Sequence, residues 1–115
     1  MKKLLFLVLL LSTFFGYAQY TLIPDVNFEK ALINEGIDSG APDGRVLTAS
    51  VNTLTTLYVP SSSITDLTGI QDFVALKTLN CDSNQLTNLD VTKNIDLTLL
   101  SCYDNQLSNI DVSQN

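Results

Sequence analysis

Residues 76–94 read LKTLNCDSNQLTNLDVTKN and residues 97–115 read LTLLSCYDNQLSNIDVSQN, so one pattern occurs twice at a spacing of 21 residues. A third and more divergent copy starts 22 residues upstream, at Leu54. A repeat this short forms one supersecondary unit that cannot enclose a core alone and has to stack on its neighbours. The sequence therefore predicts stacked repeat units at 54–75, 76–96 and 97–115.

Each unit opens with strand periodicity. Leu79 and Cys81 alternate with polar residues, which is typical of a strand with one buried face. Equivalent strands should lie side by side in a parallel sheet, about 4.8 Å apart, with the leucines stacked beneath it. In this register the outward positions form three columns: Thr56, Thr78 and Leu99; Tyr58, Asn80 and Ser101; Pro60, Asp82 and Tyr103.

Asparagines follow the strands where the chain turns away. Asn84 and Asn105 occupy equivalent positions, and the first unit has Ser62 there. A buried turn leaves backbone groups without a strand partner, and an amide side chain offers both donors and an acceptor to pair with them. We expect a structural asparagine ladder at these positions rather than a binding site.

The second half of each unit also alternates. We expect Leu89, Val91, Ile110 and Val112 to point inward, and Asn88, Asp90, Asn109 and Asp111 to point outward. A 21-residue unit is too short for a full outer helix with its loops, so extended or 3₁₀ structure and gentle curvature are predicted on the outer side.

Carboxylates are predicted to stack on this outer side. Asp90 and Asp111 should lie close together, with Asp66, Asp72 and Asp96 on the same side. Their repulsion can be relieved by solvent or by weak calcium binding. The EF-hand and glycine-rich calcium patterns are absent from the sequence, which favours a solvated outer face without a metal site.

A short helix is predicted before the repeats. Phe28 and Leu32, with Ala31 and Ile33 beside them, recur at helical spacing; Pro24 and Asp25 are start signals and Gly36 is a stop signal. The apolar stripe would cover the open end of the repeat stack. Residues 38–44 have turn chemistry, and Thr48 either caps a one-turn helix or belongs to a strand. Residues 19–53 are thus a helical cap with its linker.

The two cysteines, Cys81 and Cys102, occupy the same inward position one unit apart. Their Cα atoms should lie about 5 Å apart, a separation that a disulfide tolerates. Both side chains, however, would point in parallel into a packed layer, where the disulfide dihedral of about 90° is hard to reach. Buried free thiols that act as small apolar fillers are the preferred interpretation, with a disulfide as the alternative.

The N-terminus has the pattern of an export signal. Lys2 and Lys3 precede an apolar run from Leu4 to Phe15, and small residues flank Tyr17, so cleavage is expected after Ala18. The run is shorter than the roughly 20 residues that span a bilayer. Residues 1–18 are therefore predicted to be a signal peptide, which leaves no membrane span in the mature chain.

Charge and composition argue against several classes of partner and chemistry. Residues 19–115 contain four basic and twelve acidic residues, and hence a net charge of −8. Nucleic acids and anionic membranes need clustered Lys and Arg, so this charge argues against them as partners. The chain has no His, which excludes histidine-based catalysis and metal binding. The carboxylates lack an apolar setting for acid catalysis, and Ser61 to Ser63 lack a base, so we predict no catalysis and no cofactor.

The repeats resemble the leucine-rich repeat family, whose shared core is L-x-x-L-x-L-x-x-N-x-L with Cys often allowed at the third leucine. The matching residues are Leu76, Leu79, Cys81, Asn84 and Leu86, and again Leu97, Leu100, Cys102, Asn105 and Leu107. The segment before them resembles the cap and first repeat of secreted bacterial proteins of internalin-like type. The residues that carry this resemblance are Ile23 to Asp25, Phe28, an Asp-Gly pair and Leu67-Thr-Gly69-Ile70.

This resemblance implies an α/β fold, a right-handed leucine-rich-repeat solenoid with its parallel sheet on the concave side and a short N-terminal helical cap. A stack that ended at Asn115 would expose an open leucine-lined edge, so we expect further repeats beyond it. The resemblance implies that a sorting domain often follows such repeats. The concave face is the family's usual ligand surface, which here is Thr56, Tyr58, Thr78, Asn80, Asp82, Leu99, Ser101 and Tyr103. Tyr58, Leu99 and Tyr103 are the residue types enriched at interfaces.

We therefore expect a secreted or cell-surface binding module that recognises a protein or a glycan, as a monomer and without catalysis. One alternative is a recognition or spacer module of a larger exported enzyme or adhesin whose active domain lies beyond residue 115. Another is a structural element of a surface layer, which would bind no ligand saturably.

Overall fold

A computed structural model describes residues 17–115; the predicted signal peptide lies almost wholly outside the described residues. The elements in order are β1 (Tyr20–Leu22), α2 (Val26–Asn34), β2 (Arg45–Leu47), α3 (Thr48–Val51), β3 (Thr56–Tyr58), the 3₁₀ helix η2 (Ile70–Asp72), β4 (Thr78–Asn80) and β5 (Leu99–Ser101). Within residues 17–115, no helix combines the length and the apolar character that crossing a membrane requires.

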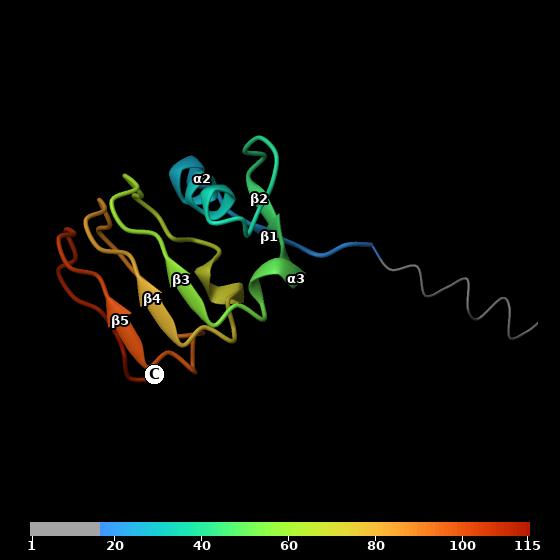
Figure 1. The fold of residues 1–115 in the computed structure, drawn as a ribbon. Helices are drawn as coiled ribbons and strands as arrows, with labels where there is room; N and C mark the ends of the chain where they lie inside the picture. The colour runs from blue at the N-terminus through green and yellow to red at the C-terminus, as the bar shows by residue number, and fades with distance from the viewer. Residues whose placement is uncertain (1–16) are drawn as a thin grey trace, which may run out of the picture.

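The repeats form a three-stranded parallel sheet in the order β3-β4-β5 (Figure 1). The register aligns Leu57, Leu79 and Leu100, one from each strand. Leu57 and Leu79 are buried, and Leu100 packs against the same core from its partly exposed position. We call residues 54–75, 76–96 and 97–115 coils 1, 2 and 3. The parallel sheet predicted from the repeat is confirmed.

Asn84 connects coil 2 to coil 1 through its side-chain amide. Its Nδ2 donates to the carbonyl of Val59 in coil 1 at 2.9 Å and to the carbonyl of Cys81 in its own coil at 3.0 Å. Its Oδ1 accepts from the backbone N–H groups of Ser62 and Ile64, both at 3.0 Å. One buried side chain thus pairs backbone groups of two coils that no strand ladder reaches.

Asn105 makes the same kind of contact between coils 3 and 2. Its Nδ2 donates to the carbonyls of Cys81 and Cys102, and its Oδ1 accepts from the N–H of Leu86. In coil 1 the hydroxyl of Ser62 donates to Pro60 within its own coil. The serine pairs one carbonyl of its own coil, because coil 1 is the first coil and has no preceding coil to contact.

A second row of asparagines, which was not predicted, lies at the far ends of coils 2 and 3. Asn94 is fully buried and donates to the carbonyls of Ile70 at 2.9 Å and Phe73 at 3.1 Å. Asn115 donates in the same way to the carbonyls of Val91 and Asn94. The coils are therefore joined by amide side chains at two separate places.

The cap helix α2 is attached to coil 1 by the carboxylate that starts it. Oδ1 of Asp25 caps the helix by accepting from the N–H groups of Asn27 and Phe28. Oδ2 accepts from the N–H and hydroxyl of Thr65 and from the N–H of Asp66, at 2.8 to 2.9 Å. Burial raises the pKa of Asp25, but these hydrogen bonds lower it more, so the carboxyl is ionised at neutral pH. The predicted helix is confirmed.

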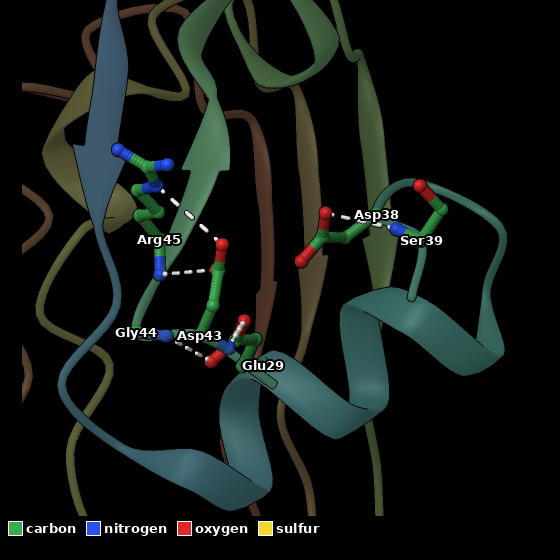
Figure 2. Close-up of polar contacts among 6 residues, drawn as sticks. All are labelled: Glu29, Asp38, Ser39, Asp43, Gly44 and Arg45. Atoms are coloured by element: carbon green, nitrogen blue, oxygen red, sulfur yellow. Dashed lines mark hydrogen bonds and ion pairs between the residues drawn. The ribbon is translucent and has the colours of Figure 1, made fainter. Parts of the chain in front are cut away.

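Glu29 of α2 holds the loop that follows the helix. Its side chain is buried, with 1% exposed, and its two oxygens accept from the N–H of Asp43 at 2.7 Å and of Gly44 at 2.8 Å (Figure 2). Two charge-assisted hydrogen bonds offset the cost of burying a carboxylate. The loop therefore has a fixed path although its sequence has turn chemistry throughout.

The antiparallel pair of β1 and β2 was not predicted. Its register aligns Thr21 with Val46, and Thr21 also donates through its hydroxyl to Asp72 of η2 at 2.7 Å. Three-residue strands are too short to show a period in sequence. From Thr48 onward the one-turn helix occurs, as α3, and the strand alternative is wrong because β2 ends at Leu47. Leu47 rather than Thr48 is at the N-cap position.

Coil 1 has one residue more than coil 2, and the addition lies where the cap contacts it. The carbonyls of Ile64 and Leu86, 22 residues apart, accept equivalent backbone hydrogen bonds. The carbonyls of Phe73 and Asn94, 21 residues apart, accept equivalent bonds further along. Between these points stands Gly69, at φ +109°, where an added Cβ would collide with the side chain of Ile23 and the carbonyl of Leu22.

The return limb mostly follows the predicted alternation. Leu89 and Val91 are buried and Ile110 packs against the core, while the predicted outward residues are exposed. Val112 is half exposed (51%), because the last described coil has a neighbour on one side only. Asp72 is a correction, since it accepts the Thr21 hydroxyl and does not join the outer carboxylates.

We predict that Gly69→Ala lowers the free energy of unfolding by about 3 kcal/mol or more, because the new Cβ meets backbone and must adopt a left-handed φ. Gly40→Ala is the matched control: Gly40 has φ +82° but nothing within 4 Å of an added Cβ. It should cost only about 1 kcal/mol. Urea denaturation measures both, and equal losses would show that the cap does not approach Gly69 closely.

We predict that Asn84→Ala lowers the free energy of unfolding by about 2–4 kcal/mol, since it leaves buried backbone groups of two coils unpaired. Asn105→Ala should cost less, because Asn105 is partly exposed and its Oδ1 accepts one bond instead of two. Urea denaturation of the two variants side by side is the measurement. A larger loss for Asn105→Ala would contradict the ladder's assigned role.

Candidate functional site

The structure gathers the predicted contact residues on one side of the sheet formed by β3, β4 and β5. We call this set the exposed sheet face: Thr56, Tyr58, Thr78, Asn80, Asp82, Leu99, Ser101 and Tyr103. The strand register pairs Thr56 with Thr78 and Leu99, and Tyr58 with Asn80 and Ser101. In the third column, the carbonyls of Asp82 and Tyr103 accept equivalent backbone bonds from Ser61 and Ser83.

Three large apolar or aromatic side chains of this face are largely exposed to solvent. The exposed fractions are 57% for Tyr58, 54% for Leu99 and 78% for Tyr103. Smaller, half-buried residues of the middle coil, such as Asn80, lie between them. Because β3 is two strands away from β5, about 10 Å separate the backbone of Tyr58 from that of coil 3.

Asp82 is engaged within the domain. Its Oδ1 accepts from the Ser101 hydroxyl and from the backbone N–H of Tyr103, both at 2.7 Å. Its Oδ2 accepts from the same hydroxyl at 2.9 Å and from Nδ2 of Asn80 at 3.1 Å. The bond from Ser101 lowers the pKa of Asp82 most, and those from Tyr103 and Asn80 lower it further. The carboxylate is therefore ionised, and its acceptor sites are largely occupied by its own chain.

Two thiols lie under this face. Cys81 is fully buried, Cys102 is partly buried, and both are free, as the preferred interpretation predicted. Burial raises the pKa of Cys81 to about 12, with smaller contributions from Cys102 and Asp82. Burial and then Asp82 also raise the pKa of Cys102. Both thiols are therefore protonated at neutral pH, which makes them core residues rather than nucleophiles.

Grooves also occur on the return limb. One of about 350 Å³ is lined by Asp66, Asp90 and Lys93 among others, and one of about 280 Å³ by Asp90 and Asp111. Oδ1 of Asp90 accepts from the hydroxyl and N–H of Thr92, which lower its pKa. Across residues 17–115, acidic and thiol side chains do not gather in any group of three or more that could hold a metal ion.

No protein-family model matches the sequence, and no curated protein matches it. Solved structures do. The functional domain of InlJ from Listeria monocytogenes, described as including a cysteine ladder, is 36% identical with a TM-score of 0.73 over 86% of this chain and 22% of that one. Internalin C2 from the same species is 28% identical with a TM-score of 0.69, over 86% and 45% of the two chains.

A third similar structure contains the CBM51-2 and INT domains of ZmpB from Clostridium perfringens, at 28% identity and a TM-score of 0.62 over 74% of this chain and 18% of that one. The chain thus spans less than half the length of each of these proteins. The likeness includes the cap as well as the sheet, since it extends over 86% of the chain. The chain has an internalin-like leucine-rich-repeat fold of the α/β class with a parallel sheet.

Proposed function

We propose that this protein is a non-catalytic binding module that contacts a macromolecular partner through the exposed sheet face. The coils would form a right-handed solenoid with this face on its concave side. The observation that carries the proposal is the exposure of Tyr58, Leu99 and Tyr103 on a face whose strands are held in register by parallel pairing. Tyrosines are enriched at interfaces, and rigid strands reduce the entropy lost on binding.

A protein is the favoured partner, and a glycan is the other outcome of the test. Leu99 is an aliphatic side chain on the same face as the two tyrosines, and it gains most from contact with apolar side chains of another protein. The net charge of −8 of residues 19–115 disfavours nucleic acid and anionic membrane. Export through the leader at residues 1–18, a location outside the cell and a monomeric state complete the proposal.

The alternative is a recognition or spacer module within a larger exported enzyme or adhesin. The ZmpB structure supports it, because there a similar segment belongs to a chain that combines CBM51 and INT domains. In that case the sheet face would still bind, while the chemistry would belong to another domain.

Binding is tested by probing protein and glycan arrays with the purified protein and measuring the dissociation constant for the strongest hit. We predict that Tyr58→Ala and Tyr103→Ala each weaken binding by about tenfold, the loss typical of a central interface residue. Tyr20→Ala is the matched control, because Tyr20 is a partly exposed tyrosine (42%) on β1, outside the face. If Tyr58→Ala and Tyr103→Ala bind as tightly as the control, the partner uses another surface.

A further inference from the structure

We propose that Asp82 is a positioning residue, which holds Tyr103 on the exposed sheet face for the partner and does not contact the partner itself. This inference rests on the proposed function of that face. It assigns to the carboxylate a role that its place in the outward column did not suggest.

Tyr103 needs such support because it lies beyond the end of a strand. β5 ends at Ser101, and Asp104 after Tyr103 has a left-handed backbone at φ +55°. The N–H of Tyr103 donates to Oδ1 of Asp82 at 2.7 Å, and its carbonyl accepts from the N–H of Ser83 at 2.8 Å. Coil 2 therefore holds the backbone of Tyr103 on both sides, while its ring stays largely exposed.

The other positions of the same column do not have this arrangement. In coil 1 the column holds Pro60, which has no carboxylate to offer coil 2. The N–H of Asp82 donates instead to Oδ1 of Asn80, within its own coil, at 3.0 Å. Tyr58 lies within β3 and needs no side-chain support. Among the three coils, the contact from carboxylate to tyrosine occurs only between coils 2 and 3.

The arrangement also determines how the face recognises a partner. Asp82 is the one charged residue among the eight of the exposed sheet face. Its two oxygens already accept from three donors of the domain: the Ser101 hydroxyl, which they share, the Tyr103 N–H and the Asn80 amide. A partner therefore meets rings, hydroxyls, an amide and an aliphatic side chain, and its affinity should depend weakly on salt, unlike that of an ion-paired interface.

One test needs no partner. In NMR spectra, the amide proton of Tyr103 should shift as pH falls and the Asp82 carboxyl takes up a proton, at a pH below the ordinary aspartate value of about 3.9 because hydrogen bonds lower its pKa. Asp82→Asn should abolish this titration, and Asp104→Asn, which changes the adjacent acid, should leave it in place. An amide that does not respond, or responds only to Asp104, would overturn the inference.

The second test uses the strongest hit of the array screen. Asp82→Ala should weaken binding about as much as Tyr103→Ala, and the double variant should lose little more, because both changes remove one contact. Asp82→Asn keeps an acceptor for the Tyr103 N–H and should bind within about threefold of the unchanged protein. Urea denaturation of Asp82→Ala confirms that coil 3 remains folded at the assay temperature.

Additive losses, or an Asp82→Asn variant as weak as Asp82→Ala, would show that the carboxylate touches the partner and would overturn the inference. If the arrays yield no partner, the proposed function fails, and the amide titration still decides whether Asp82 positions Tyr103.

Discussion

The pairing of backbone groups between coils by amide side chains is the constraint on which the rest of the structure depends. Each strand has only three residues, so the backbone hydrogen bonds between strands join successive coils over a short distance. Asn84 and Asn105 satisfy the turns after the strands, and Asn94 and Asn115 satisfy the far end of the coil. Because a buried unpaired carbonyl or N–H is costly, these amides fix the stacking register and hence the columns on the sheet face.

The cap closes one end of the stack through an apolar core that it shares with the coils and through polar contacts of a few side chains. Asp25 starts α2 and binds coil 1, Glu29 holds the loop before β2, and Thr21 joins β1 to η2. Apolar burial adds to this, since the rings of Phe28 and Phe73 stack with centroids 6.2 Å apart. Gly69, which lies near the additional residue of coil 1, has no Cβ, and this gives Leu22 and Ile23 room to approach. Coil 1 thus differs from coils 2 and 3 at the positions that contact the cap.

Rigidity and exposure are divided between different residues of the sheet face. The side chains of Asn80, Asp82 and Ser101 form hydrogen bonds with one another. Tyr58, Leu99 and Tyr103 are instead largely exposed to solvent. A preorganised polar face with exposed rings loses little entropy on binding, which suits a recognition surface. The buried, protonated thiols beneath it fill space in the core and add no reactivity.

The sequence by itself determined whatever follows from local periodicity: the repeat, the parallel sheet, the three columns, the helix between Asp25 and Gly36, and the turns at Asn84 and Asn105. Only the tertiary structure decided the contacts between residues far apart in the chain. Four of these contacts join segments at least 14 residues apart: the β1–β2 pairing, the hydrogen bond from Asp43 to Glu29, that from Asn94 to Ile70 and that from Tyr103 to Asp82. Val112 shows the converse, because an alternating pattern states which way a side chain faces but not whether a neighbour covers it. Period and turn chemistry are encoded over a few residues, whereas partners across coils depend on how the coils are stacked.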